Sequence, residues 1–327
     1  MVSFFAPVDL EQVWQTKQER GSIARRRVQL GVFGAETYVS TLSTENVEMG
    51  PYPPRVSPAL VDASLRPSAR WRVAKVLLPL PDHDFDVTEV AVPWRLLTRA
   101  GHEVVFATER GGAPPAADPL LLTGVLFGQL GAASEPRAFY RELVLTPAFR
   151  APMAWRDVDP AAFDGLVLPG GHAPGMRQYL EAQVLHEKVA AIVALGRPVG
   201  AICHGVLVLA RARDALTGKS VLADRRTTCL PKYMERTAYL LTFWKLGRYY
   251  RTYPTYVEDE VKAALRDPAS QFVRGPRTLS ARGDLDDDRP AFVVEDGSYV
   301  SARWPGDAYL FTRRFEAKLV AAPRERV

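Results

Sequence analysis

Cys203 and His204 are the adjacent residues whose types and setting best fit catalysis. They follow an apolar run at residues 199–202 and precede another at 206–210, which predicts a strand, a tight turn and a helix. Ala201 and Gly205 are small, as a nucleophile on such a turn requires, because the strand and helix backbones crowd each other there. The N-terminus of the following helix favours thiolate over thiol. The sequence therefore predicts Cys203 as a nucleophile and His204 as its partner in proton transfer.

A glycine pair, Gly170 and Gly171, follows another apolar run at residues 163–169. Glycines after a strand allow close backbone approach, and their N–H groups can form an oxyanion hole. The alternative is a simple turn. His172 comes next and is expected either to line the mouth of a pocket or to be an ordinary loop histidine.

Strands and helices alternate from Trp71 onward. The expected strands are 72–79, 103–108, 163–169 and 198–202, and the expected helices are 87–100 and 183–195. Strand–helix–strand units of this length are nearly always parallel and right-handed. The pattern predicts a doubly wound α/β fold with a mainly parallel sheet and helices on both faces. Ligands of such sheets bind at the carboxyl ends of the strands, where the residues above lie.

Three local features refine this expectation. Asp86 or Thr88 is expected to cap the helix at 87–100, and Pro93 should kink that helix or mark its first turn. Residues 109–160 are rich in Gly, Ala and Pro, with one helical stretch near 139–145. We expect them to form an insertion over the sheet edge or over the site.

Four segments together resemble the ThiJ/PfpI superfamily. They are residues 85–89, 168–172, 201–205 and 294–305. This superfamily is a branch of the flavodoxin-like, class I glutamine amidotransferase-like fold, and it includes PfpI-type peptidases, protein deglycases and glyoxalase III-type chaperones. The resemblance covers about residues 71–320 and depends on the ordered combination of an acid, a Gly-Gly turn and a Cys-His elbow.

The resemblance implies roles for two further side chains. The glutamate that matches Glu89 reaches the cysteine sulfur in this family, although Glu89 alone would read as a solvated glutamate in the first turn of a helix. Burial and a nearby negative charge would raise its pKa. The histidine that matches His204 serves the cysteine as general base or acid, which requires the turn to bend because adjacent side chains usually point apart.

The third member of the site stays open. PfpI-type peptidases place a glutamate from a neighbouring subunit shortly after the Gly-Gly turn, but Gly175 stands there, which counts against a peptidase. In the chaperone and glyoxalase branch an acid follows a proline, and Glu235 lies four residues after Pro231. Such a carboxylate would fix the tautomer of His204. A surface helix glutamate is the alternative.

These residues favour a cysteine-dependent hydrolase or lyase that acts on a small carbonyl, amide or glycated substrate, which can be a small molecule or a modified protein. A holding chaperone and a thiol redox or stress sensor are the alternatives. A glutamine amidotransferase is excluded because no histidine follows His204. No organic cofactor is expected, since neither GxGxxG nor a P-loop follows a strand. No metal is expected either. A zinc site from Cys203, His204, His172 and an acid is the alternative, but five histidines show no HxxxH spacing and the cysteines no CxxC.

Composition limits the remaining classes. Hydrophobic residues make up 47% and charged residues 24% of the 327 residues, which is ordinary for a globular protein. The net charge of +5 comes without a basic stripe between aromatics, so no nucleic-acid partner is expected. No apolar run approaches the roughly 18 residues of a transmembrane helix, and the N-terminus lacks a signal-peptide pattern, so no membrane partner is expected. Two cysteines are too few for a disulfide framework, which predicts a cytoplasmic location.

The chain divides near residue 70. Residues 1–70 hold an arginine run and a proline cluster, which predicts an irregular N-terminal extension with one short helix near 10–18. Residues 71–327 are expected to form one α/β domain, and the resemblance implies a homodimer. Cys229 is expected to be a small buried hydrophobe. The aromatic stretch at 243–256 is expected to pack in the core or an interface, or to wall a substrate pocket.

Overall fold

The computed structural model describes residues 73–124, 131–278 and 280–322. The predicted N-terminal extension and its short helix lie outside these residues. The described residues form an α/β structure in which strands and helices alternate along the chain, as the sequence predicts.

The described residues build a seven-stranded sheet with the order β5-β3-β1-β6-β7-β9-β8. Its strands are β1 (Lys75–Pro79), β3 (Glu103–Thr108), β5 (Met153–Ala154), β6 (Gly165–Leu168), β7 (Val199–Ile202), β8 (Val293–Asp296) and β9 (Tyr299–Ala302). All neighbours pair in parallel except β8 and β9, which are antiparallel. Two short strands, β2 (His83–Phe85) and β4 (Ala116–Ala117), pair separately. The mainly parallel sheet is therefore confirmed.

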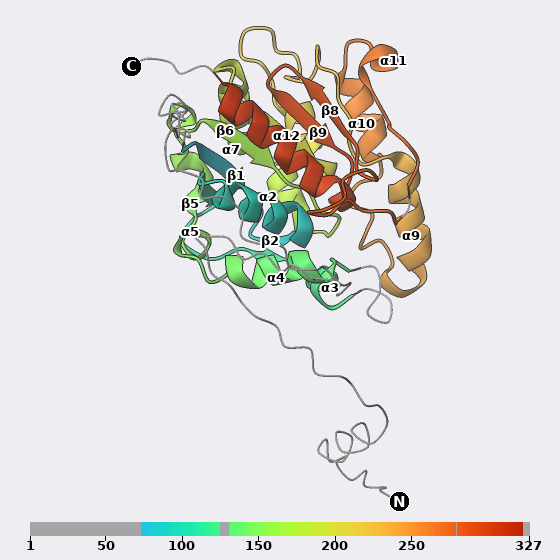
Figure 1. Cartoon of the computed structure of the whole chain (residues 1–327). Helices are drawn as coiled ribbons and strands as arrows, with labels where there is room; N and C mark the ends of the chain where they lie inside the picture. Colours follow the sequence, from blue (N-terminus) through green and yellow to red (C-terminus); the bar gives the residue numbers. More distant parts are fainter. Residues whose placement is uncertain (1–72, 125–130, 279, 323–327) are drawn as a thin grey trace, which may run out of the picture. The chain divides into compact units, whose positions relative to one another are not determined.

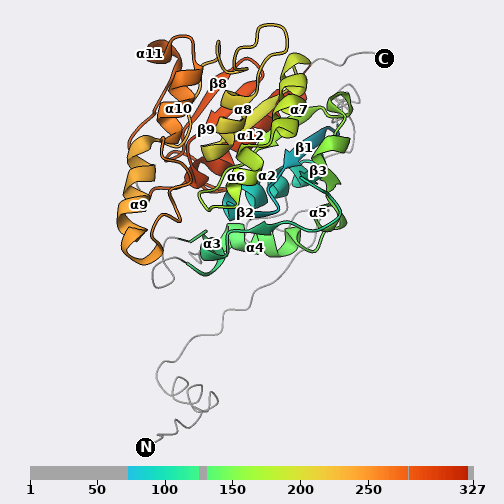
Figure 2. The ribbon, with the colours of Figure 1, turned by 180° about the vertical axis from the view of Figure 1, so that it is seen from behind.

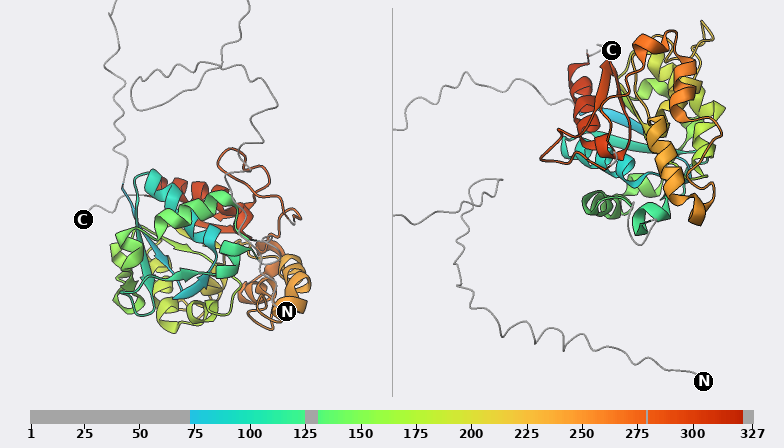
Figure 3. Two further views of the ribbon diagram at one scale, coloured as in Figure 1. Left: turned by 90° about the horizontal axis from the view of Figure 1, so that it is seen from below. Right: turned by 90° about the vertical axis from the view of Figure 1, so that its right-hand side faces the viewer.

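Helices cover both faces of the sheet (Figures 1 and 2). One face carries α2 (Val87–Arg99) and α12 (Ala308–Ala321), with α4 (Ser134–Leu143) packed on α2. The other carries α6 (Met176–Leu180), α7 (Gln183–Ala194) and α8 (Val206–Arg211). The helices α9 (Lys232–Leu246), α10 (Val257–Ala264) and α11 (Pro268–Gln271) gather at one side of this unit, in orange in Figure 3. Two short helices, α3 (Pro119–Thr123) and α5 (Pro147–Arg150), complete the set.

The first helix begins where the sequence predicts. Asp86 is the N-cap of α2, and its Oδ1 accepts hydrogen bonds from the backbone N–H of Thr88 at 2.7 Å and of Glu89 at 3.1 Å. Pro93 is the seventh residue of α2, so it does not mark the first turn. Because proline has no N–H, the carbonyl of Glu89, four residues earlier, lacks its usual helical partner.

The predicted insertion at 109–160 extends the sheet edge. It supplies β5, which pairs with β3 as an outer strand, and α4, which packs on α2. The helix expected near 139–145 is α4, and it begins earlier, at Ser134. The insertion therefore supports the helix whose first turn carries Glu89.

The central strands are buried throughout. Every residue of β6 and β7 is buried, as expected of strands covered on both faces. Gly200 in β7 allows α12 to pack closely, because a Cβ there would lie 2.7 Å from the ring of Phe311. No helix among the described residues has the length and apolar character needed to cross a bilayer.

Candidate active site

Cys203 stands at a strained turn between β7 and α8. Its φ is +57°, a left-handed conformation that is uncommon outside glycine and often marks a functional position. Gly205 permits the turn, because a Cβ there would lie 2.1 Å from the carbonyl oxygen of Leu168 in the neighbouring strand. The strand–turn–helix geometry predicted for the elbow is confirmed.

The glycine turn after β6 lies directly against this elbow. A Cβ on Gly170 would lie 2.6 Å from the backbone nitrogen of His204 and 3.1 Å from the Cβ of Cys203. The N–H of Gly170 donates to Glu89 Oε2 at 2.7 Å. This N–H is therefore engaged and is not available to an oxyanion, which corrects the role predicted for Gly170. The N–H of Gly171 has no acceptor in the part of the chain that the structure describes.

Glu89 is fully buried beside Cys203. Its Oε2 is held by Gly170, and its carboxyl group interacts with the thiol of Cys203. Desolvation and the negative charge of Asp86 raise the pKa of Glu89 well above its ordinary value. Glu89 is not the solvated glutamate that its position in the first turn would suggest.

His204 turns back toward the thiol. Its Nδ1 lies 3.5 Å from the Sγ of Cys203, so the bend at the elbow brings these adjacent side chains to the same side. Burial lowers the pKa of His204 well below its ordinary value. A neutral imidazole in this place can accept the proton of the thiol.

The structure corrects the predicted charge of the nucleophile. Desolvation and the charges of Glu89 and Asp86 raise the pKa of Cys203 well above its ordinary value. The helix N-terminus acts in the opposite direction, but α8 is a helix of six residues, and Cys203 is only 1% exposed. Burial therefore favours the neutral thiol, in the opposite direction to the thiolate expected from the sequence.

His172 joins the site from the glycine turn. Its ring meets the ring of His204 edge-on, with centroids 4.7 Å apart, and burial lowers the pKa of His172 to about 4. The ring of Tyr250 also packs edge-on against the ring of His172, with 5.8 Å between the two ring centroids. Thr252 Oγ1 donates to the His172 carbonyl oxygen at 2.6 Å. The aromatic stretch 243–256 thus supplies a wall of the site, one of the three outcomes expected for it.

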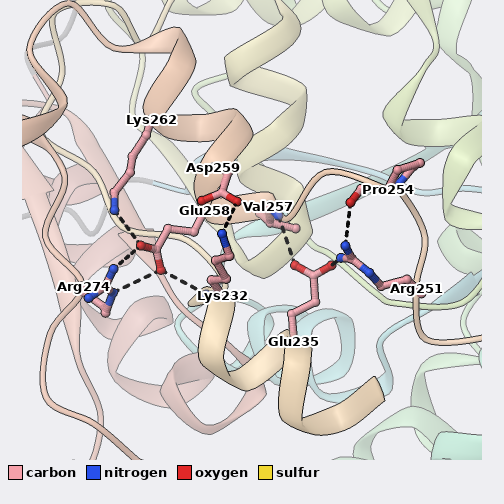
Figure 4. Close-up of polar contacts among 9 residues, drawn as sticks. All are labelled: Lys232, Glu235, Arg251, Pro254, Val257, Glu258, Asp259, Lys262 and Arg274. Atoms are coloured by element: carbon pink, nitrogen blue, oxygen red, sulfur yellow. Dashed lines mark hydrogen bonds and ion pairs between the residues drawn. The ribbon is translucent and has the colours of Figure 1, made fainter. Parts of the chain in front are cut away.

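Glu235 does not contact His204, which corrects its predicted role. The Oε1 of Glu235 accepts from Arg251 Nη1 at 2.7 Å, and its Oε2 accepts from the N–H of Val257 at 3.0 Å (Figure 4). Both oxygens are therefore used to join α9 to the loop before α10. Glu235 is nevertheless buried, so it is not a surface glutamate either.

A cavity of about 250 Å³ borders the site. Its wall includes His172 from the glycine turn and several side chains that sequence reasoning did not assign to the site. They are Asp86 and Thr88 at the start of α2, Leu121, Leu230, Met234 and Leu241, and Arg282, Trp304 and Pro305. The sequence predicted Asp86 as a possible helix cap. It gave no signal for Arg282, which lies in a loop without a local motif.

Three possible metal ligands come together here. Ligand atoms of His172, Cys203 and His204 all lie within 4.8 Å of one another, and these side-chain types suit a soft cation such as Zn²⁺. They are three members of the zinc site that the sequence left as an alternative, and they show no ligand spacing there because they come from two separate turns. Cys229, the other cysteine, is buried and free, as predicted.

The sequence of this chain is similar to known proteins. A family profile described as ThiJ/PfpI family-like matches residues 80–276. The sequence is 29% identical over 265 residues to an uncharacterised protein of Schizosaccharomyces pombe, covering 79% of this chain and 88% of the relative. It is 27% identical over 243 residues to a protein named deglycase from Pyrococcus abyssi, covering 73% and 96%.

A solved structure shares the fold. The crystal structure of glyoxalase III from Candida albicans superposes with a TM-score of 0.55 at 20% identity, covering 75% of this chain and 97% of that one. At this identity the similarity concerns the arrangement of strands and helices.

Proposed function

Because this chain belongs to the ThiJ/PfpI family, we propose that it is a cysteine-dependent enzyme that attacks the carbonyl carbon of a small aldehyde, amide or glycated compound. The observation that supports this is the strained Cys203, whose sulfur has His204 Nδ1 at 3.5 Å and interacts with the buried carboxyl of Glu89. A nucleophile, a base and a second proton carrier are thereby within reach of one reacting atom.

The first step starts from the neutral thiol. As the sulfur bonds to the carbonyl carbon, the thiol proton moves to the Nδ1 of His204 and the C=O π electrons move onto oxygen. The backbone N–H groups of Gly171 and His204 are the donors nearest to this oxygen in the proposal. An aldehyde gives a hemithioacetal in this way, and an amide gives a tetrahedral adduct.

The second step returns the proton. The imidazolium of His204 protonates either the oxyanion or the departing nitrogen. Glu89, whose pKa is raised by burial, can take up a proton during the reaction and pass it to the sulfur when the sulfur leaves as thiolate. Release then requires water. Loss of the protonated nitrogen leaves a thioester on Cys203. The hemithioacetal of a 1,2-dicarbonyl becomes a hydroxy thioester when the proton on its carbon moves to the adjacent carbonyl carbon and its hydroxyl proton moves to that carbonyl's oxygen. Addition of water to either thioester gives the carboxylic acid and returns the sulfur as thiolate.

The names of two similar proteins suggest which substrates to test first. A deglycase and a glyoxalase III are proteins named for chemistry at glycated groups and at dicarbonyls. We therefore take a 1,2-dicarbonyl and its adducts with amino acids as the first candidate substrates for this chain.

Turnover of methylglyoxal, and of its adducts with N-acetyl-lysine, tests the proposal. Wild type is compared with the variants Cys203→Ala and His204→Gln, and formation of the hydroxy acid is followed by NMR. Cys229→Ala is the matched control, since Cys229 is also a buried free cysteine but lies outside the site. We expect loss of activity in the first two variants and near-wild-type activity in the control. Activity that survives Cys203→Ala would overturn the proposal.

One observation favours a holding chaperone as a second candidate. The helix α9 exposes Leu240, Leu241, Phe243 and Trp244, with exposed fractions from 48% to 63%. Neighbouring apolar side chains of this kind can bind unfolded clients. Two results would support this function over the enzyme. Cys203→Ala should suppress aggregation of a client protein as well as wild type does, and a double variant with Phe243→Ser and Trp244→Ser should lose this suppression.

A further inference from the structure

The cavity beside the site combines an apolar wall with one cation. Leu121, Leu230, Met234 and Leu241 line it, and Arg282 faces it from the loop before β8. Arg282 also lines an adjacent outer hollow, so its side chain lies at the boundary between the two spaces. Asp86 also lines the cavity, and a mostly apolar surface with a small number of polar groups is the usual composition of a small-molecule site.

Arg282 has no direct anionic partner. Within the described residues its guanidinium forms no ion pair and donates no hydrogen bond. Asp86 exerts the largest effect of any charged group on Arg282, yet Asp86 Oδ1 already caps α2. An arginine without an ion pair can bind an anion that a ligand brings.

The guanidinium is nevertheless held in place. It lies over the ring of Trp304, with 4.9 Å between its central carbon and the ring centroid. The next residue, Gly283, donates from its N–H to the carbonyl oxygen of Gly306 at 2.8 Å, which ties the Arg282 loop to the segment after β9. Stacking and this backbone bond orient the side chain in advance, which reduces the entropy lost when an anion binds.

Two neighbouring donors also lack acceptors. The hydroxyl of Thr88 and the indole N–H of Trp304 are buried and unpartnered, and both residues belong to the same wall as Arg282. Three donors therefore belong to the wall of one largely apolar cavity. Such an arrangement matches a ligand that brings acceptor oxygens to that wall.

We propose that Arg282 binds a carboxylate of the substrate, so that the compound attacked by Cys203 carries an apolar body between its reactive carbonyl and a carboxylate. This inference rests on the proposed function for its carbonyl, but the anion site itself can be tested without turnover. A carboxylate fits better than a phosphate, because one guanidinium faces the cavity and Asp86 adds negative charge nearby.

The binding test uses the Cys203→Ala variant, which has no nucleophile. We measure Kd by calorimetry for para-ethylbenzoate and for its neutral counterpart para-ethylbenzamide. We expect the carboxylate to bind more tightly by about tenfold or more, as loss of a charge-assisted hydrogen bond implies. Adding Arg282→Gln should remove this preference, and Arg282→Lys should restore it in part.

The matched control is Arg289→Gln, which changes an exposed arginine of the same loop that pairs with Asp287. It should leave both Kd values unchanged. Equal binding of acid and amide by the Cys203→Ala protein, or a preference that survives Arg282→Gln, would overturn the carboxylate site.

Turnover separates this inference from the proposed function. Phenylglyoxal with a para carboxylate is compared with the para carboxamide in the wild-type background. Arg282→Gln should raise KM for the carboxylate compound without changing its kcat. It should leave both KM and kcat for the carboxamide compound unchanged. If neither compound is converted while the binding preference holds, the proposed chemistry fails and the anion site stands. If both are converted equally by wild type and Arg282→Gln, the chemistry stands and the anion site fails.

Discussion

Glu89 Oε2 accepts a hydrogen bond of 2.7 Å from the N–H of Gly170, a residue 81 positions later in the chain. This bond joins the first turn of α2 to the turn after β6, and the elbow of β7 lies against the same glycine. The carboxyl group is thereby fixed by one oxygen and interacts with the thiol of Cys203. Three separate strand-to-helix connections thus meet at one sulfur atom.

The first prediction concerns the ionisation of this sulfur. Because burial and the charge of Glu89 raise the pKa of Cys203, alkylation by iodoacetamide should require a pH above the ordinary thiol pKa of about 8.5. Glu89→Gln removes the charge and keeps an oxygen for Gly170, so it should move the alkylation profile to lower pH. Mass spectrometry of the Cys203 peptide gives both profiles. A wild-type thiol that titrates below the free-cysteine value of about 8.5 would contradict the structure.

A second prediction concerns the close approach at Gly170. Gly170→Ala places a Cβ 2.6 Å from the backbone nitrogen of His204. Relief of this contact requires a shift of one of the two backbones, which is unfavourable. Overpacking of this kind costs about 1–3 kcal/mol and should displace the elbow, so activity should fall more than stability. Gly218→Ala is the control, since nothing lies within 4 Å of its Cβ and only its positive φ is strained. Urea denaturation and turnover of both variants provide the comparison, and equal activity would count against the packing argument.

The elbow and the glycine turn could be predicted because their chemistry is local. Small residues at fixed distances from Cys203 and a glycine pair after an apolar run are visible without any long-range contact. The charge of Cys203 could not be predicted, since it depends on how deeply the thiol is buried and on the carboxyl groups that the fold brings to it.

Glu235 shows where a spacing pattern fails. Its distance from Pro231 matches the expected acid, but the direction of its side chain depends on the loop that returns from α9, and Arg251 in that loop pairs with it. Arg282 was missed for the complementary reason that its neighbours in the cavity come from distant parts of the chain. The predicted homodimer and cytoplasmic location stay predictions.

The third prediction separates a structural from a catalytic role for Glu235. Its carboxylate is 1% exposed and pairs with Arg251 at 2.7 Å, so Glu235→Ala leaves an unpaired, mostly buried guanidinium. Breaking a buried pair in this way costs about 3–5 kcal/mol of unfolding free energy. Activity per folded molecule should stay near wild type, because Glu235 does not touch His204. Denaturation curves and turnover rates of Glu235→Ala test this prediction. The control is Asp224→Ala, which breaks an exposed ion pair with Arg266.

The final prediction concerns stability against pH. Burial raises the pKa of Asp86 from 3.8 to about 6, so the folded state binds its proton more tightly than the unfolded state does. The stabilisation from this proton is complete below the unfolded pKa and is lost as pH rises through the folded pKa. The shift of about two units corresponds to about 3 kcal/mol at most.

Asp86→Asn removes this titration and keeps an oxygen to cap α2. The unfolding free energy of wild type should therefore fall relative to that of Asp86→Asn between about pH 4 and pH 7, as linkage requires. Urea denaturation across this range measures the difference, and the exposed Asp214→Asn variant serves as the control for an aspartate with a lowered pKa. If wild type and Asp86→Asn ran parallel over the whole range, Asp86 would not be protonated near pH 6, and its carboxylate would face the cavity as a charge throughout.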